Sequence, residues 1–359
     1  MRSTIMEVDK KEFINNIKKI KEYVGDKEIL PVIKANGYGT HINKELDIVN
    51  MFNIVGVAIV DEAKELRSIG YKKDILVLNQ PSIDEIDEII NNNIIIGLSS
   101  IEFLEELVKR KSKIRIHLEI ETGMNRTGVK YDDLDLFISK IKENANITVE
   151  GIYTHLSSAD FDKNYTLKQL EIFDKSVNKI KKEFNSIKYI HSQASNGLLN
   201  YHDDCTNLVR AGIIMYGYES FPNSKNIIDF KPICKLKTKI TYLKEIEEKE
   251  AVSYSQKFIS NKKMKIATIP IGYADGLRRE LLNIGEVVIN NQKVKIVGTI
   301  CMDSCMIDVT DIENVKVGDT IYIWDNDIIT IDEIASKCNT INYEIMSTIS
   351  DRVPRVFTN

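Results

Sequence analysis

The feature that most constrains the fold is an alternation of short apolar runs with segments of helical period, from residue 9 to about residue 215. This alternation is typical of a parallel sheet with crossover helices. We expect eight strands, at residues 29–33, 54–60, 75–78, 94–98, 114–120, 149–153, 189–191 and 208–209. Eight strands over about two hundred residues predict an α/β fold of the (β/α)8, TIM-like type, with its chemistry where strands end and loops begin.

The pattern changes after about residue 232, where alternating strands joined by turns begin. Residues 286–297 indicate a hairpin, with two asparagines at its turn. The sequence therefore predicts an N-terminal barrel over residues 1–232 and a C-terminal, mostly-β domain over residues 233–359, and leaves open whether residues 1–8 join the β domain. The length of 359 residues agrees with two domains.

Composition and charge exclude several classes of protein. The apolar fraction of 43%, the charged fraction of 28% and the net charge of −4 are typical of a globular protein with no nucleic-acid partner. The N-terminus has no apolar signal core, and no apolar run approaches the roughly 18 residues of a membrane span, so we expect a cytoplasmic chain without membrane contact. The five scattered cysteines form no CxxC pair, which predicts free thiols and no metal site.

One lysine stands where the first predicted strand ends. Lys34 follows residues 29–33 and precedes a turn that contains Gly37. A desolvated lysine can form a Schiff base with an aldehyde cofactor, because burial and nearby cations lower its pKa toward neutrality. A solvated surface lysine is the alternative, and this residue alone does not decide between them.

The motifs around Lys34 resemble those of the alanine racemases, pyridoxal-phosphate enzymes of fold type III, in family order and at family spacing. They are residues 32–39 (VIKANGYG), 121–128 (ETGMNRTG), 153–155 (YTH), 210–217 (RAGIIMYG), 252–254 (VSY), 269–276 (IPIGYADG), 298–303 (GTICMD) and 350–355 (SDRVPR). The resemblance covers nearly the whole chain. It implies an amino-acid racemase that uses pyridoxal 5'-phosphate and works as a homodimer with composite active sites.

The resemblance also implies catalytic roles. Lys34 would hold the cofactor as a Schiff base, and Arg210 would face the pyridine nitrogen. A guanidinium donates and does not give up its proton, so the ring becomes a weaker electron sink and transamination is discouraged. Racemisation needs an acid/base group on each face of the α-carbon. Lys34 would serve one face and Tyr254 of the partner subunit the other, with the tyrosine pKa depressed through His155.

The remaining implied residues bind the phosphate and the substrate. The phosphate ligands would be Tyr38, Ser195, Gly212 and Ile213, whose hydroxyl and amide groups suit a dianion. Arg126 would contact the phenolate oxygen of the cofactor and the substrate carboxylate, aided by the Met302 backbone. Tyr273 would line the entry from the partner chain.

Three positions depart from the family pattern. Many relatives carry a lysine, often carbamylated, where this chain has Glu119, and we expect this carboxylate to hold Arg126 without modification. The usual arginine before Ile-Cys-Met-Asp is Thr299, and the usual tyrosine before Arg-Val-Pro-Arg is Asp351. Serine/alanine racemases associated with vancomycin resistance, the closest in active-site pattern, also replace this tyrosine with a small polar or acidic residue. The change favours a serine/alanine racemase that supplies D-amino acids for peptidoglycan precursors.

Alternatives remain open from the sequence. An acidic entrance equally suits lysine or ornithine, whose cationic ends need an anionic partner. A basic amino-acid decarboxylase joins a similar barrel to a β domain but carries different motifs, and a non-catalytic, single-barrel cofactor-binding protein lacks the domain with Tyr254. The resistance-type enzymes carry a membrane domain, so the chain is either an independent enzyme or the soluble catalytic part of a longer membrane-anchored protein.

Overall fold

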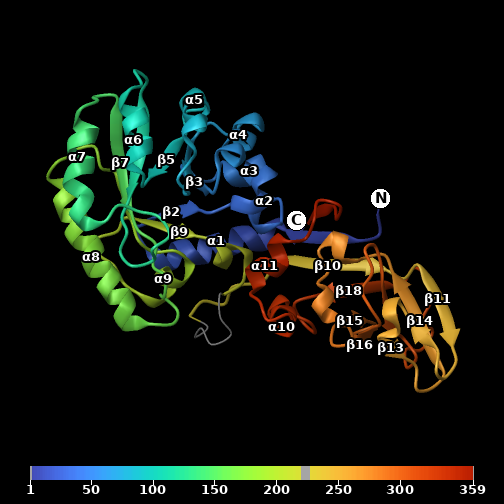
Figure 1. The fold of residues 1–359 in the computed structure, drawn as a ribbon. Helices are drawn as coiled ribbons and strands as arrows, with labels where there is room; N and C mark the ends of the chain where they lie inside the picture. Colours follow the sequence, from blue (N-terminus) through green and yellow to red (C-terminus); the bar gives the residue numbers. More distant parts are fainter. Residues whose placement is uncertain (1, 220–226, 359) are drawn as a thin grey trace. The chain divides into compact units, whose positions relative to one another are not determined.

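The computed structural model describes residues 2–219 and 227–358 of the chain. These residues form two compact units (Figure 1). The barrel unit comprises Ile14–Gly37 and Ile42–Phe230, and the β unit comprises Met1–Phe13, Tyr38–His41 and Lys231–Asn359. The short segment Tyr38–His41, which follows the Lys34 motif, therefore packs with residues distant from it in the sequence.

The barrel unit contains the eight predicted strands, all parallel. They are β2 (Glu28–Pro31), β3 (Ile54–Val57), β4 (Asp74–Val77), β5 (Ile95–Leu98), β6 (Ile114–Glu119), β7 (Ile147–Tyr153), β8 (Tyr189–His191) and β9 (Leu208–Ala211). Strands β3 to β8 form one sheet in chain order, and β2 pairs with β9. A bridge between Val32 and Gly56 continues β2 toward β3, and the N–H of Asn207, which precedes β9, donates to the Ile190 carbonyl in β8. The predicted barrel is confirmed.

Helices surround these strands on the outside of the barrel unit (Figure 1). They are α1 (Lys10–Val24), α3 (Leu46–Val49), α4 (Val60–Ser68), α5 (Ile86–Asn91), α6 (Ile101–Val108), α7 (Leu134–Lys142), α8 (Lys163–Lys181) and α9 (Ser195–Asn200), with the short turn α2 (Lys34–Tyr38). Because the helices cover the sheet, β3 and β5 are buried at every position, which explains their continuous apolar runs. Over residues 2–219 and 227–358, no helix has the length and apolar character to cross a membrane.

The β unit is built on one nine-stranded sheet in the order β11-β14-β17-β16-β15-β18-β10-β1-β19. Its strands are β1 (Ile5–Asp9), β10 (Cys234–Lys239), β11 (Tyr242–Ile246), β14 (Met264–Ile269), β15 (Glu286–Ile289), β16 (Gln292–Val297), β17 (Cys305–Asp308), β18 (Thr320–Trp324) and β19 (Arg355–Thr358). The predicted hairpin is β15–β16, where Asn290 and Asn291 take the positive φ of its two-residue turn. Strand β1 pairs with β10 and β19 and so joins this sheet.

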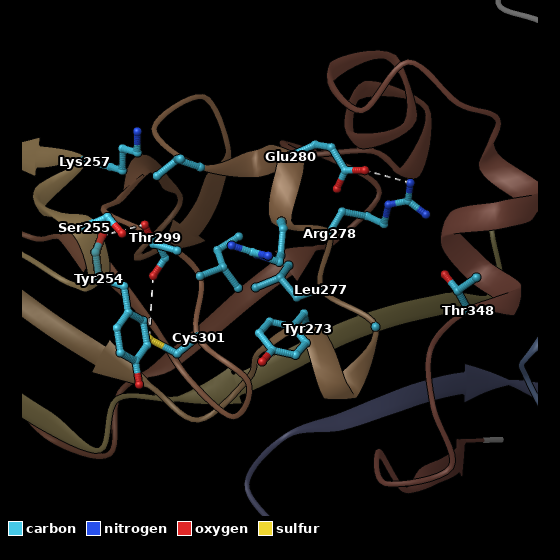
Figure 2. A pocket seen from close by; sticks show the side chains of 14 residues that line it. Tyr254, Ser255, Lys257, Tyr273, Leu277, Arg278, Glu280, Thr299, Cys301 and Thr348 are labelled. Carbon is cyan, nitrogen blue, oxygen red and sulfur yellow. Dashed lines mark hydrogen bonds and ion pairs between the residues drawn. The ribbon is translucent and has the colours of Figure 1, made fainter.

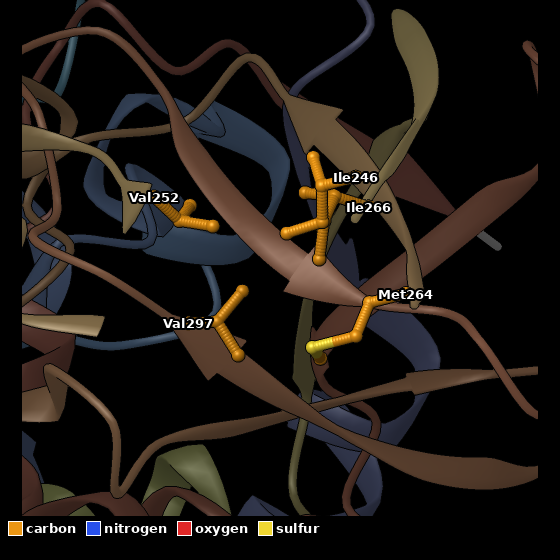
Figure 3. Packing of buried hydrophobic residues seen from close by; sticks show 5 residues of the cluster. All are labelled: Ile246, Val252, Met264, Ile266 and Val297. Carbon is orange, nitrogen blue, oxygen red and sulfur yellow. The ribbon is translucent and has the colours of Figure 1, made fainter. Parts of the chain in front are cut away.

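A small apolar cluster lies at one end of this sheet and includes the residue that precedes Ser253 and Tyr254. Its members are Ile246, Val252, Met264, Ile266 and Val297 (Figure 3). Val252 ends the short strand β12 (Ala251–Val252), which pairs with β13 (Phe258–Ile259). Full burial of one such side chain contributes about 1.5–3 kcal/mol. The cluster therefore anchors the chain just before Tyr254.

Candidate active site

Lys34 stands at the carboxyl end of β2 and opens a left-handed turn. Ala35, Asn36, Gly37 and Tyr38 have φ values of 52°, 54°, 59° and 54°. This conformation costs roughly 1–2 kcal/mol for each residue with a Cβ, so the surrounding contacts must hold it. The Gly37 N–H donates to the Ile33 carbonyl and closes the turn. The predicted rim position of Lys34 thus carries local backbone strain, which is common at functional sites.

Glu62, in the first turn of helix α4, stabilises the left-handed segment after Lys34 by hydrogen bonds. One of its carboxylate oxygens accepts the Ala35 N–H at 2.6 Å, and the other accepts the Ala58 N–H at 2.7 Å. Burial, together with the positive charges of Arg126 and Arg210, lowers the pKa of Lys34, while Glu62 opposes the shift. An amine with a lowered pKa is the nucleophile that carbonyl chemistry needs. Sequence reasoning missed Glu62, although a glutamate at the third position of a helix after a barrel strand is a recognisable signal.

Arg210 lies beside this lysine in the interior of the barrel unit. It is paired with Leu30 across the β2–β9 ladder and is almost fully buried. Its guanidinium donates to the backbone carbonyls of His191, Ser192 and Thr154 at 2.7–3.0 Å. Burial lowers the pKa of Arg210 to about 10, which still leaves it charged near neutral pH. Arg210 is therefore a buried, positively charged group held in place near the carboxyl ends of the barrel strands.

A chain of two buried histidines lies behind Arg210. Arg210 donates from Nη1 to His191 Nδ1 at 2.8 Å, and His191 Nε2 lies 2.9 Å from His117 Nδ1. Because a guanidinium has no acceptor, His191 Nδ1 must be the acceptor and His191 Nε2 must carry the proton that is donated to His117. Burial, followed by nearby positive charges, lowers the pKa of His117 to about 3 and that of His191 well below its usual value. Both rings are therefore neutral.

His155 contacts the other side of the same guanidinium. Arg210 Nη2 lies 3.4 Å from His155 Nδ1, a long hydrogen bond that again makes this nitrogen the acceptor. Burial, with the charges of Arg210, Arg126 and Lys34, lowers the pKa of His155 to about 3. His155 is therefore neutral with its proton on Nε2. Such a ring can donate a hydrogen bond to an anion without carrying charge itself.

Three predicted phosphate ligands come together at the ends of β8 and β9. Ser195 is the first residue of α9, and its Oγ accepts the Gly212 N–H at 3.1 Å. Ile213 opens a short 3-10 turn (Ile213–Tyr216), whose first amides have no partner within the turn itself. A hydroxyl and amides at the start of a helical turn fit an anionic group.

The fourth predicted phosphate ligand, Tyr38, falls in the β unit. It is buried, with its ring centroid 6.0 Å from that of Tyr343. Burial raises the pKa of the Tyr38 hydroxyl, so it remains a neutral donor.

Comparisons with known proteins agree with this geometry. The model of the alanine racemase N-terminal domain matches residues 8–220, and that of the alanine racemase C-terminal domain matches residues 233–357. The chain belongs to the alanine racemase family. It is 37% identical to alanine racemase 2 of Caldanaerobacter subterraneus subsp. tengcongensis (99% of this chain, 95% of the relative) and 38% identical to alanine racemase of Methanococcus maripaludis (98% and 97%). The crystal structure of alanine racemase from Bacillus anthracis with bound L-Ala-P has a TM-score of 0.94 at 31% identity, covering 100% of this chain and 96% of that one.

Membership of the alanine racemase family makes the protein an isomerase that uses pyridoxal phosphate. The described residues fit this group, since the barrel unit holds an amine of lowered pKa at Lys34, a buried guanidinium at Arg210, and a hydroxyl with adjacent amides at Ser195 and Gly212. The cofactor supplies the electron sink for cleavage of a Cα–H bond. The protein supplies attachment, orientation and electrostatics.

Glu119, one of the three positions that depart from the expected pattern, is buried at the end of β6. Thr127 and Tyr153 lie beside its carboxylate, and its Oε2 accepts no hydrogen bond in the described parts of the chain. Both Glu119 and Arg126 are described and no ion pair joins them, but the Arg126 charge is close enough to oppose the rise that burial causes in the pKa of Glu119. Glu119 is buried, whereas Arg126 is exposed on a loop whose Asn125 N–H donates to the Glu121 carboxylate.

We therefore expect Glu119 to act on the site by its charge and by the Thr127 contact next to Arg126. Burial raises the pKa of Glu119, while the nearby arginines oppose the shift. A Glu119→Gln variant should lower kcat/KM for alanine roughly tenfold, because hydrogen bonds to charged groups contribute about 1.5–3 kcal/mol. Steady-state racemisation and cofactor titration measure this. Unchanged activity and unchanged cofactor affinity would contradict the role of Glu119.

Tyr254 lies in the β unit on a strained loop. Ser253 and Ser255, on either side of it, have φ values of 67° and 60°, and the Tyr254 side chain is exposed (68% for the residue). Thr299 fixes the loop, since its hydroxyl donates to the Tyr254 carbonyl at 2.9 Å while the Ser253 hydroxyl donates to the Thr299 carbonyl at 2.6 Å. Thr299 thus has a structural role that sequence reasoning did not foresee.

A pocket of about 850 Å³ in the β unit is lined by Tyr254, Tyr273, Thr299 and Cys301 (Figure 2). The Tyr273 N–H donates to the Cys301 carbonyl, and the Ala274 N–H donates to the Met302 carbonyl at 3.0 Å. The predicted residues Tyr254 and Tyr273 therefore share a pocket, and the Met302 backbone is tied to the turn that carries Tyr273.

Asp351 lies in the β unit between the end of α11 (Asn342–Ser347) and β19. Its carboxylate oxygen Oδ1 is 3.0 Å from His41 Nε2. The sequence drew attention to Asp351 but not to His41, which stands seven residues after Lys34. Their pairing joins positions 310 residues apart, and no local pattern predicts such a contact.

Proposed function

We propose that this racemase acts on serine as well as alanine and supplies D-amino acids for peptidoglycan precursors. The observation that carries the proposal is Asp351, which stands where relatives have a tyrosine. A carboxylate takes less room than a phenol ring and accepts a hydrogen bond from a hydroxyl. The exposed side chain of Asp351, with Oδ1 engaged by His41, leaves Oδ2 as an acceptor. Serine differs from alanine by one hydroxyl, so this group can discriminate between them.

We further propose that Lys34 and Tyr254 are the two acid/base groups of the racemisation. Lys34 would move a proton on one face of the substrate Cα, and Tyr254 of the partner subunit would do so on the other. A neutral His155 that donates from Nε2 suits the stabilisation of a tyrosinate, and Arg126 would orient the substrate carboxylate. This arrangement requires a homodimer with two composite sites.

An Asp351→Tyr variant should lower kcat/KM for serine at least roughly tenfold more than for alanine, because one hydrogen bond to a charged group contributes about 1.5–3 kcal/mol. Chiral chromatography of D- and L-serine and of D- and L-alanine, each with the purified holoenzyme, measures the ratio. Equal losses for the two substrates would remove Asp351 from the specificity argument. Absence of serine turnover in the wild type would overturn the proposal itself.

Basic amino acids provide the discriminating control. Lysine and ornithine need a charged partner, whereas a serine hydroxyl needs only an acceptor oxygen. Asp351→Asn should therefore retain much of the serine turnover, because the amide keeps its acceptor oxygen. If the wild type prefers lysine or ornithine, and Asp351→Asn abolishes that preference, the substrate class is basic amino acids instead.

A further inference from the structure

His41 is held in an unusual backbone conformation beside Asp351. Its φ is 62°, a left-handed value that is uncommon for a residue with a Cβ. The His41 side chain is 16% exposed, while that of Asp351 is 73% exposed. A carboxylate only accepts hydrogen bonds, so His41 Nε2 must carry the proton that joins them. The His41 imidazole is therefore a largely buried donor that hydrogen-bonds to one oxygen of the exposed Asp351 carboxylate.

The segment that carries His41 is itself fixed in the β unit. The Arg355 Nε–H donates to the Gly39 carbonyl at 2.8 Å. A Cβ at Gly39 would lie 2.3 Å from the Met346 carbonyl oxygen, and its φ is 81°, so only glycine fits there. The Tyr38 ring next to it packs near Tyr343. His41 therefore projects from a segment with little freedom to move.

The loop that carries Asp351 is held from two sides. Arg355 donates to the carbonyls of Ser350 at 2.7 Å and Val353 at 2.6 Å. Arg352, the neighbour of Asp351, donates to Asp303 at 2.6 Å. The Ser350 N–H donates to the carbonyl of Asp275, whose carboxylate is buried and paired with Arg2. The backbone on both sides of Asp351 is therefore fixed, and its exposed side chain is the part that remains to be oriented.

We propose that His41 is a specificity-determining positioning residue that orients the Asp351 carboxylate toward the hydroxyl of serine. This inference rests on the proposed serine activity. In this proposal His41 holds Oδ1 and leaves Oδ2 to accept the hydrogen bond of the substrate hydroxyl. Without this hydrogen bond, the exposed Asp351 side chain would rotate freely and its acceptor oxygen would point in several directions. Because His41 fixes the side chain before the substrate binds, substrate binding does not have to offset the loss of side-chain entropy.

The chain contains a second histidine–aspartate pair that serves as a matched control. His202 Nε2 lies 2.7 Å from Asp204 Oδ1, with side chains 83% and 91% exposed. Such a pair contributes about 0–1 kcal/mol and positions nothing. The contrast is in burial, since the His41 ring is packed while the His202 ring is in solvent.

The test compares His41→Phe, which keeps a ring but no donor, with His41→Gln, which keeps a neutral donor. The kcat and KM values for L-serine and L-alanine are measured on the holoenzyme of each variant. We expect H41F to raise the serine KM roughly five- to tenfold with kcat nearly unchanged, because a binding interaction equal in ground and transition states acts on KM. Both alanine constants should stay near wild type, and H41Q should restore most of the serine KM.

A double-mutant cycle with Asp351→Ala isolates the coupling. Once the carboxylate is absent, H41F should cause no further loss of serine selectivity. His202→Phe should leave all four constants unchanged. If H41F does not fold, His41→Gly replaces it, because glycine tolerates positive φ and has no side-chain donor.

The outcomes separate this inference from the proposed function. Equal losses for serine and alanine in H41F, or a full additional loss in the Asp351→Ala background, would show a structural role and overturn the positioning role. If Asp351 variants change serine selectivity but H41F does not, only the role of His41 fails. If Asp351 variants do not change selectivity at all, Asp351 has no role in specificity and the inference on His41 fails with it, whereas absence of serine turnover in the wild type would overturn the serine proposal itself.

Discussion

A Lys34→Ala variant is expected to lose racemisation of alanine by roughly 10⁴-fold or more, because on the proposed assignment it removes both the covalent attachment of the cofactor and one acid/base group. Chiral chromatography of the product mixture measures the loss. Borohydride reduction of the wild-type holoenzyme, followed by peptide mass analysis, should place the cofactor on Lys34. Lys27 is the matched control, since burial also lowers its pKa but Gln193, Thr206 and the Asp203 carbonyl already accept its protons. Reduction of a Lys27→Ala variant should still label Lys34, whereas a label on another lysine would contradict the assignment.

The same variant tests the composite homodimer. Tyr254→Phe should also be inactive as a pure variant, because it removes the second acid/base group. Mixed dimers of Lys34→Ala and Tyr254→Phe subunits contain one intact site each, so co-refolding should restore about a quarter of wild-type activity if sites are shared across a two-fold axis. No recovery would place both groups in one subunit, and activity that resists dilution to monomers would do the same.

Removal of Arg210 is expected to have the second largest effect, on both stability and reaction specificity. Arg210→Met leaves the carbonyls of His191, Ser192 and Thr154 buried without their donor. Since an unsatisfied buried group costs about 1–3 kcal/mol, the free energy of unfolding should fall by roughly 3–5 kcal/mol, measured by urea denaturation. If Arg210 faces the pyridine nitrogen, as the family resemblance implies, the cofactor ring would also lose its fixed cation. Racemisation should therefore slow while transamination, detected as pyruvate formed from alanine, becomes measurable.

Arg115→Met provides the control for this prediction. Arg115 also lies in the barrel unit and pairs with Asp74 at 2.8 Å and Glu150 at 3.4 Å, but it is partly exposed. Its loss should cost about 1 kcal/mol or less and form no pyruvate. If Arg210→Met and Arg115→Met have the same effects, the special position of Arg210 is refuted.

The sequence predicted the barrel well because its signal is local and repeated. Burial on both faces makes each strand a continuous apolar run, and all eight runs became strands. Boundaries were less exact. The run at residues 54–60 was expected to be one strand, but β3 ends at Val57 because α4 begins at Val60 and Glu62 binds the Ala58 amide. Helix-start chemistry there overrides the apolar pattern.

The contacts that organise the site could not be predicted in the same way. His117 and His191 are 74 residues apart. In the sequence, each is a histidine within an apolar strand, and nothing nearby indicates its partner. His117 fits because Gly151 has no side chain, since a Cβ there would lie 2.5 Å from the imidazole. The His41–Asp351 pair likewise depends on a left-handed residue and on tertiary contacts. Family motifs identify which residues matter, but only the fold shows what holds them in place.

The neutral histidines behind Arg210 have a consequence for how the enzyme responds to its surroundings. Neither His117 nor His191 takes up a proton at physiological pH, because burial keeps the pKa of both far below neutrality. The arginine beside them therefore keeps one charge and one hydrogen-bond pattern across the whole physiological range. On the role of Arg210 that the family resemblance implies, mild acidification would leave the electrostatic environment of the cofactor ring unchanged, and we expect no bend in a pH–rate profile from His117 or His191.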